Sequence, residues 1–431
     1  MNFALLGHDP LLAGLARNLA SDERHRLRWA CAIGEFRGEL LATIPNIELV
    51  DEWESLAGEA ALEAVILAAP RPESEPTRTG PEGASDEPVR RLAQAGKHLL
   101  VVRPEDLSLV TCYELARICD ETGSVVLPIS TDLLHPALAP FGNPAEAARV
   151  GPVRHVTLQR FLREGPGRDR ANGKPILESG DGCNPPALLN QFARDVFLLR
   201  FVAGEISHVN VLPSPARSER PPSAPSDAGN DTAPTSLCVS MANRHGTMTT
   251  WTAVSSRTIP PGAQLTVKSD RAVTTCHWTD LSAGVDVKIE TAQGVHSERF
   301  GPWDPAANAL DQFVRAVAGP RPCSGLSDAT NCIDLADAAG RSMRRGRTVE
   351  LSQEAQTEAG SFKGTMAAVG CGLLGCVLMA LVVTAVAEGL GVGWIHYAWY
   401  GIVPLLAVFL VLQLLGLIVP RTENAATREH E

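Results

Sequence analysis

The sequence lacks both the ligand spacings of a metal site and the basic excess of a nucleic-acid binder. Its ten cysteines include no CxxC pair and no Cys/His metal-ligand spacing, so we expect no metal and reduced, mostly buried thiols. The formal net charge is −11, and only the short segment from Arg341 to Arg347 is strongly basic. We therefore predict no nucleic-acid partner.

The N-terminal residues lack the pattern of a secretory signal. Met1 to Ala20 has no basic region followed by an apolar core and a cleavage site, so we expect no signal peptide. The chain has 431 residues, of which 45% are hydrophobic and 20% charged, as in a globular protein with two or three structural units. Together with the cysteine usage, this favours a cytoplasmic location for the soluble part.

Charge is also missing from two long segments near the C-terminus. Gly364 to Ala387 contains no charged residue, and Ile395 to Val419 contains only His396 near its start. Each run is long enough to cross a hydrocarbon core of about 30 Å, so we predict two transmembrane helices rather than a buried helical hairpin. Lys363 and Arg421 flank the pair, whereas the loop between the runs has no Lys or Arg. The positive-inside rule then places both termini and the soluble domains on the cytoplasmic side of the inner membrane.

The chain begins with a pattern typical of a strand, a turn and a helix. An apolar strand is predicted from Asn2 to Gly7 and a helix from Leu11 to Ala20. The dinucleotide fingerprint G-x-G-x-x-G would fall on Gly7, Asp9 and Leu12, so only its first glycine is present. Asp9 followed by proline is typical of a helix N-cap. A carboxylate there would repel a cofactor phosphate by roughly 4 kcal/mol at about 4 Å and an effective dielectric near 20, which handicaps dinucleotide binding unless the loop moves.

The stretch from Leu92 to Pro104, LAQAGKHLLVVRP, indicates a helix end, a glycine stop at Gly96 and a buried strand. It resembles the AGKHV-x-x-EKP signature of the Gfo/Idh/MocA oxidoreductase family. Residues 64–70 resemble the V-x-I-A-x-P strand of that family, and residues 188–204 align without gaps to its LLDLGIHDLDLLRWLLG helix. The segment that ends at Leu351 resembles the closing R-x-G-R-x-V-x-L motif, so the resemblance covers residues 2–351.

The resemblance implies an α/β fold with two soluble domains. Residues 1–140 would form a Rossmann-like domain with a parallel sheet. Residues 141–351 would form an α/β substrate and oligomerisation domain with an open, mostly antiparallel sheet and a disordered insertion near 213–235. A linker at 352–363, the two spans within 364–419 and a tail at 420–431 would follow. The resemblance further implies a homo-oligomer.

The same resemblance implies NAD or NADP as the cofactor. Its binding region would include Gly7, Asp9, Leu12, Glu35 and Pro70. Glu35 follows the second predicted strand and would hold a ribose hydroxyl, or it is a solvated loop glutamate. We predict that residues 71–88, rich in Pro, Glu, Gly and Ser, form an exposed, mobile loop.

The residues at the catalytic positions of the family differ in this chain. Arg103 stands where the family has its lysine, Arg194 where it has the proton-transferring histidine, and Phe197 where it has an aspartate. Asp195 survives at a position that varies in the family. Hydride transfer to or from a carbinol needs a group that exchanges a proton near neutral pH, which arginine does not do. The two arginines would make the cleft cationic and favour an anionic ligand, or each pairs with a surface carboxylate.

No spacing rule singles out the remaining titratable residues. The other candidates are Tyr113, Asp132 and Lys174, and we interpret His135, which precedes Pro136, as a packing or capping residue. Two functions stay open: a catalytically degenerate, membrane-anchored protein of this fold that acts in ligand binding, regulation or assembly, and an active NAD(P)-dependent oxidoreductase for a sugar or cyclitol-like substrate. The losses at the catalytic positions favour the first.

Overall fold

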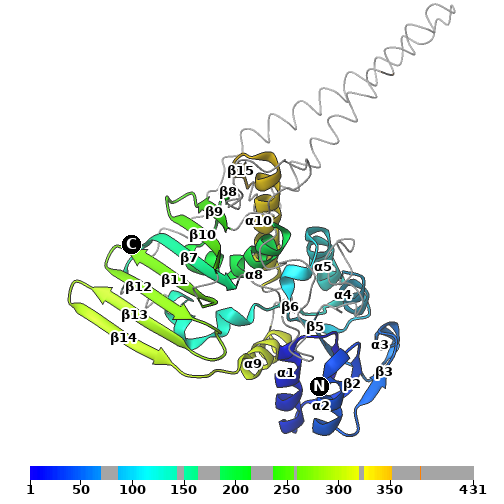
Figure 1. Cartoon of the computed structure of the whole chain (residues 1–431). Helices are drawn as coiled ribbons and strands as arrows, with labels where there is room; N and C mark the ends of the chain where they lie inside the picture. The colour runs from blue at the N-terminus through cyan, green and yellow to red at the C-terminus, as the bar shows by residue number, and fades with distance from the viewer. Residues whose placement is uncertain are drawn as a thin grey trace, which may run out of the picture. The chain divides into compact units, whose positions relative to one another are not determined.

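The structure is a computed structural model of the whole chain. It describes residues 1–68, 86–142, 150–163, 185–214, 236–256, 260–319, 325–351 and Met379. Residues Met1–Ser352 form one compact unit and Gln353–Glu431 a second. The first unit contains two sheets with helices packed against them (Figure 1).

Six parallel strands form the first sheet, in the order β3-β2-β1-β4-β5-β6. They are β1 (Asn2–Leu6), β2 (Arg26–Cys31), β3 (Glu48–Val50), β4 (Ala64–Leu67), β5 (His98–Val101) and β6 (Val126–Pro128). This is the strand order of a Rossmann fold. After the first residues of β1 and β5, Asn2 and His98, the central strands are apolar and buried, as expected where helices cover both faces of a parallel sheet. The Rossmann-like prediction is therefore confirmed.

Two apolar cores lie on opposite faces of this sheet, because successive side chains of a strand point to opposite sides. The helices are α1 (Pro10–Ser21), α2 (Arg37–Thr43), α3 (Glu54–Gly58), α4 (Asp86–Gln94) and α5 (Leu109–Thr122). Phe3 and Leu5 pack with residues of α1 and α2, whereas Ala4 and Leu6 pack with residues of α3, α4 and α5. A late helix, α9 (Pro305–Ala318), completes the first of these cores with Phe313.

The second sheet has nine strands in the order β14-β13-β12-β11-β7-β10-β9-β8-β15. They are β7 (Val153–Arg163), β8 (His208–Ser214), β9 (Ser236–Ala242), β10 (Met248–Ser256), β11 (Gly262–Ser269), β12 (Ala272–Trp278), β13 (Val285–Thr291), β14 (Gly294–Phe300) and β15 (Val349–Glu350). Only the central pair β7 and β10 is parallel among these paired strands. The predicted open, mostly antiparallel sheet is confirmed.

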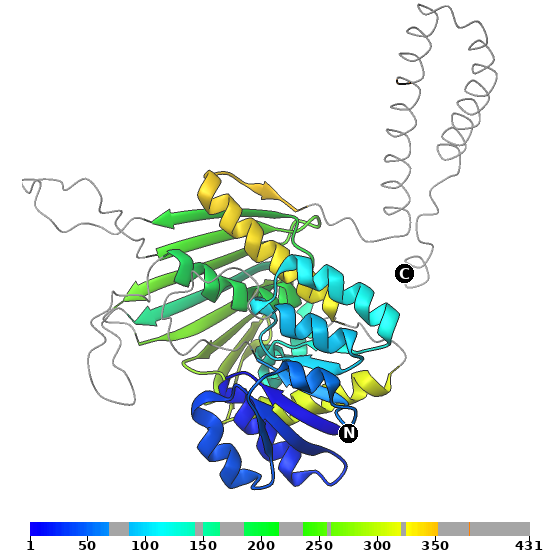
Figure 2. The same cartoon turned by 90° about the vertical axis from the view of Figure 1, so that its right-hand side faces the viewer.

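Helices α8 (Pro185–Ala203) and α10 (Leu326–Arg345) lie on one face of the nine-stranded sheet (Figure 2). They form with it a single apolar core, in which the rings of Phe192 and Trp251 meet edge to face at 5.4 Å. The first half of α10 also reaches the core under β5, through Leu326 and Ile333. The two sheets of this unit are therefore joined by shared helices.

Short single-turn elements connect these layers. They are the 3₁₀ helices η1 (Gly34–Phe36), η2 (Pro104–Asp106), η3 (Thr131–Leu134) and η4 (Pro136–Leu138), and the helix α6 (Ala139–Gly142). Of these, η2 and η3 follow strands β5 and β6 directly at the carboxyl edge of the first sheet. Ligands of open parallel sheets bind at this edge.

Some sequence predictions need correction and some lie outside the described residues. Pro213 belongs to strand β8 rather than to an insertion, and Pro88 lies in the first turn of α4 rather than in a loop. Both positions suit proline, which is tolerated in the first turn of a helix and near a strand end. Residues 71–85, 215–235, 352–363 and 420–431 lie outside the described residues.

The two predicted membrane spans cannot be compared with the structure. Both fall outside the described residues, except for the single residue Met379. Among the helices that the structure does describe, none is long and apolar enough to cross a membrane. The spans therefore stay a prediction from sequence.

Candidate functional site

Asp9 caps the helix that follows the first strand. The chain leaves β1 through Gly7, which has a φ of 99°, a left-handed conformation that favours glycine. The Oδ1 atom of Asp9 then accepts a hydrogen bond of 2.9 Å from the backbone N–H of Leu11, and Pro10 is the first helical residue. The predicted N-cap is confirmed. The cap is buried, because Asp9 is only 8% exposed.

Arg103 binds the other oxygen of the same carboxylate. It follows β5, two strands from β1 in the sheet, and its Nε donates a hydrogen bond of 2.6 Å to Oδ2 of Asp9. Burial lowers the pKa of Arg103, but the charge of Asp9 and this hydrogen bond outweigh it and raise that pKa. Both oxygens of Asp9 are thus engaged within the protein.

This arrangement does not fit a dinucleotide in the usual pose of a Rossmann fold, in which pyrophosphate lies on the N-terminus of the first helix. Asp9 stands where the second glycine of the fingerprint lets phosphate approach the backbone. Leu12 stands at the third glycine position and is buried in the core, with 2% exposure. The anion that the helix N-terminus attracts is already present as the Asp9 carboxylate.

Glu105 and Arg194 form an ion pair between the two halves of the unit. Glu105 lies in η2, two residues after Arg103, and Arg194 lies in α8. The Nε atom of Arg194 is 3.4 Å from Oε1 of Glu105, whose side chain is 12% exposed. Burial and the charge of Asp106 raise the pKa of Glu105 to about 7, against the opposing charges of Arg194 and Arg103. Glu105 therefore exchanges a proton near neutral pH.

Sequence reasoning missed Glu105. The available signal was a carboxylate directly after the Arg-Pro pair that closes a buried strand, since this position faces the carboxyl edge of the sheet. The pairing with Arg194 joins residues 105 and 194, which no local spacing rule connects.

Asp195 is a fully engaged internal counter-ion. Its side chain is 1% exposed and pairs with Arg160 of β7 through both carboxylate oxygens, one of them at 2.7 Å from the Arg160 Nε. The Nε1 of Trp251 donates to Oδ2 at 2.8 Å, and the Nε2 of Gln191 donates to Oδ1 at 3.2 Å. With its oxygens satisfied in this way, Asp195 fixes α8 to the sheet.

Asp132, in η3, lies in the field of the same arginines. Burial, together with the charge of Asp195, raises its pKa, whereas Arg160 and Arg194 lower it. The group therefore contains three arginines, Arg103, Arg160 and Arg194, and four carboxyls, those of Asp9, Glu105, Asp132 and Asp195. Each of the three arginines has a carboxyl partner. Of the two alternatives given for Arg103 and Arg194, the structure shows ion pairing, and their partners are largely buried carboxyls rather than surface carboxylates.

His135 is a capping and packing residue, as predicted. Its Nδ1 accepts a hydrogen bond of 3.1 Å from the backbone N–H of Ala137, and the ring is 1% exposed. Trp303 and Phe300 meet the ring edge to face at 5.1 and 6.0 Å. Burial lowers the pKa of His135, so the neutral ring is favoured.

Of the remaining predicted candidates, Tyr113 has a described side chain, and it does not belong to this group. Tyr113 is 49% exposed on α5. The backbone of Glu35 lies in η1, but its side chain is outside the described residues, as are Pro70 and Lys174. No group of three His, Cys, Asp or Glu residues within the described ranges could hold a metal ion.

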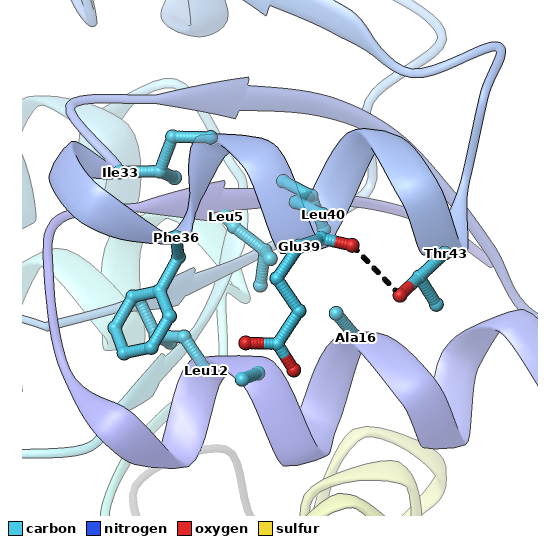
Figure 3. A pocket seen from close by; sticks show the side chains of 9 residues that line it. Leu5, Leu12, Ala16, Ile33, Phe36, Glu39, Leu40 and Thr43 are labelled. Atoms are coloured by element: carbon cyan, nitrogen blue, oxygen red, sulfur yellow. Dashed lines mark hydrogen bonds between the residues drawn. The ribbon is translucent and has the colours of Figure 1, made fainter.

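A small, shallow hollow lies elsewhere, between α1 and α2 (Figure 3). Its lining consists of Leu5, Leu12, Ala13, Ala16, Ile33, Phe36, Glu39, Leu40 and Thr43. The lining is mostly apolar, and the Thr43 hydroxyl is already used in a hydrogen bond of 2.9 Å to the Glu39 carbonyl. None of the arginines of the ion-pair group lines this hollow. It therefore does not suit a phosphate.

Comparison with known proteins supports the fold. No protein-family model matches the chain, and no curated protein matches it. A solved structure of a putative myo-inositol dehydrogenase from Sinorhizobium meliloti is 16% identical with a TM-score of 0.57, over 82% of this chain and 100% of that one. An aldose-aldose oxidoreductase from Caulobacter crescentus is 15% identical with a TM-score of 0.60, over 81% and 99%.

A 3-ketoreductase from Actinomadura kijaniata, solved with NADP and TDP-benzene, is 15% identical with a TM-score of 0.58, over 79% of this chain and 97% of that one. These proteins are oxidoreductases of the kind that the sequence resembles. At such identities the likeness shows a shared fold.

Proposed function

We propose that this chain, which has the fold of the sugar and inositol oxidoreductases, is a membrane-anchored ligand-binding protein that does not turn over NAD(P) in the usual pose of that fold. The observation that carries the proposal is the Asp9–Arg103 pair at the N-terminus of α1. A pyrophosphate in the usual pose would meet the Asp9 carboxylate, and the arginine that could compensate it is already bound to that carboxylate.

Calorimetric titration of the full chain in detergent with NADH, NADPH and their oxidised forms tests this proposal. We expect no binding to the wild type, and a gain of binding for Asp9→Asn, since asparagine keeps the cap and removes the charge. Asp304→Asn is the matched control, because Asp304 caps α9 before Pro305 and accepts a hydrogen bond of 2.9 Å from the N–H of Ala306. Tight binding of any of these nucleotides to the wild type would overturn the proposal.

The ligand that we propose is a small anionic molecule held at the ion-pair group. Arg194 supports this proposal, because its side chain is 44% exposed, compared with 33% for Arg103 and 15% for Arg160. Arginine recognises carboxylates and phosphates with paired N–H donors. Arg194 is therefore the guanidinium most open to a ligand in this group.

Membrane attachment is a proposal from the two apolar runs of the sequence. The runs at 364–387 and 395–419 would span the inner membrane as helices, with the soluble domains and both termini on the cytoplasmic side. Extraction of membranes with alkaline carbonate and with detergent tests the anchor. We expect release by detergent alone; release by carbonate would contradict the anchor. Protease accessibility from the cytoplasmic side tests the orientation.

An active NAD(P)-dependent oxidoreductase is the alternative, and Glu105 favours it. A carboxyl with a pKa of about 7 can give and take a hydroxyl proton, which Arg103 and Arg194 do not do. The similar structures include enzymes named for inositol and aldose substrates. Nicotinamide absorbance during incubation with cyclitols and aldoses would reveal turnover, and Glu105→Gln should then abolish it.

A further inference from the structure

Arg194 is held less tightly than the other two arginines of the ion-pair group. Arg103 and Arg160 each donate a hydrogen bond of 2.6 to 2.7 Å to an aspartate. The Arg194–Glu105 contact is 3.4 Å, longer than the 2.7–2.9 Å typical of a charge-assisted hydrogen bond. An incoming anion could therefore displace Glu105 from Arg194 with little loss of bonding.

The two partners of this pair differ in exposure. Arg194 is 44% exposed and stays charged at any physiological pH, whereas Glu105 is 12% exposed. If an anion took its place on Arg194, the Glu105 carboxylate would lose its counter-ion while staying largely buried. A buried carboxylate without a partner becomes protonated instead of staying charged.

Burial and the charges of nearby described residues set the protonation state of Glu105. Asp106 and burial favour the protonated form, whereas Arg194 and Arg103 favour the carboxylate. Arg103 is occupied by Asp9, and α10, which also packs against η2, contributes none of these charges. Asp132 is the other carboxyl that senses Arg194. The balance at Glu105 thus depends on what Arg194 binds.

We propose that an oxyanion, a carboxylate or a phosphate ester, binds to the Arg194 guanidinium in place of Glu105, and that Glu105 takes up one proton as the anion arrives. This inference rests on the anion-binding function proposed above. No covalent bond forms or breaks except the O–H bond of Glu105, whose proton comes from solvent. The proton neutralises Glu105 after its carboxylate has lost the Arg194 guanidinium as a counter-ion. The site therefore binds its ligand more tightly as the pH falls.

Titration of the full chain with sodium sulfate and with sodium acetate tests the proposal, because both anions keep a fixed charge between about pH 6 and pH 8. Sulfate represents a phosphate ester and acetate a carboxylate, so the tighter one identifies the ligand class. We expect the wild-type affinity to fall about tenfold per pH unit above about pH 7, and calorimetry in buffers of different ionisation enthalpy to show uptake approaching one proton per anion.

Four variants decide where the proton goes. Glu105→Gln should bind at every pH as tightly as the wild type does at low pH, without proton uptake, and Arg194→Gln should not bind. Asp132→Asn should keep the pH dependence of the wild type. Glu114→Gln, which breaks the partly buried pair with Arg90 on α4, is the control and should behave as the wild type.

The outcomes separate the two proposals. Anion binding that does not change with pH in the wild type, or pH dependence that is lost in Asp132→Asn and kept in Glu105→Gln, would overturn proton coupling and leave anion binding intact. Absence of binding for both anions in the wild type and in Glu105→Gln would overturn the anion-binding function itself. Circular dichroism of each variant shows that it is folded.

Discussion

Asp9 and Asp304 cap two neighbouring helices, α1 and α9, in the same way. Each precedes a proline, and each accepts a hydrogen bond of 2.9 Å from the backbone N–H two residues later. The helices pack against each other, since a Cβ on Gly14 of α1 would lie 3.1 Å from the Ala306 Cβ of α9. Only at Asp9 does an arginine engage the second oxygen among the described contacts.

The comparison of the two caps predicts that replacement by alanine lowers the free energy of unfolding by different amounts at Asp9 and at Asp304. Asp304→Ala should lower the free energy of unfolding by about 1 kcal/mol, the usual value of an N-cap. Asp9→Ala should lower it by roughly 2–4 kcal/mol, because Arg103 also loses a charged hydrogen bond. Urea unfolding of the detergent-solubilised chain measures both. Equal costs would show that Arg103 contributes nothing to the cap, and a double-mutant cycle with Arg103→Ala isolates its share.

Because the Arg160–Asp195 pair is buried, we predict that its loss destabilises the protein much more than the loss of an exposed arginine–aspartate pair. Asp195→Asn should destabilise the fold by about 3–5 kcal/mol, because Arg160 is left with an uncompensated charge in the core. Its surface counterpart is Arg154–Asp270, which has the same two-point contact at 2.7 and 2.9 Å but lies at 63% and 40% exposure. Asp270→Asn should cost far less, because solvent screens an exposed ion pair and it contributes little to stability. Similar costs at the two sites would refute the role of burial.

His135 predicts a loss of stability in acid. Its folded pKa lies below the ordinary value near 6.5, so its contribution is complete above about pH 6.5 and disappears as the pH falls through the lowered pKa. His25 and His98 are shifted in the same direction by burial, so the wild-type profile alone does not isolate His135.

The substitution His135→Asn separates this contribution, because asparagine can still cap η4 but does not titrate. Unfolding at about pH 7.5 and about pH 5 should show a smaller acid loss for the variant than for the wild type. An identical difference between the two pH values in both proteins would exclude His135 as a source of acid sensitivity.

The buried cysteines should resist alkylation in the folded protein. Burial raises the pKa of Cys112, Cys276 and Cys332 to about 12, so almost no reactive thiolate forms at neutral pH. Cys238 is partly exposed on β9. Treatment with iodoacetamide followed by peptide mass spectrometry should label Cys238 in the folded protein, and Cys112, Cys276 and Cys332 only after denaturation. Rapid labelling of Cys276 in the native state would contradict its buried position.

Helix starts and ends were predicted well, because the capping residues and glycines that mark them are local features of the sequence. Asp9-Pro10 marked the start of α1, and the left-handed Gly96 follows α4 as predicted. Strand β14 was missed because it is exposed along nearly its whole length and has no apolar face to produce alternation. Strand β8 was likewise hidden by the proline near its end, which indicates a turn in a sequence read alone.

The candidate site depended on contacts that local patterns do not encode. The positions of Arg103 and Arg194 came from a family resemblance, but their partners did not. Asp9 lies 94 positions from Arg103, and Arg160 lies 35 positions from Asp195. Glu105 draws its raised pKa from burial and from Asp106, and burial is a property of the assembled fold. Pairing and titration therefore required the three-dimensional structure.

The helix α9 has a consequence for how the chain is made. Phe313 packs edge to face on Phe3 of the first strand at 6.2 Å, and it is fully buried. Because α9 leaves the ribosome about 300 residues after β1, the core on this face of the first sheet stays incomplete while the first strands are emerging. A nascent chain arrested before Pro305 should therefore depend on chaperones, and nonsense or frameshift truncations in the second half should be lost to proteolysis rather than accumulate as a folded N-terminal fragment.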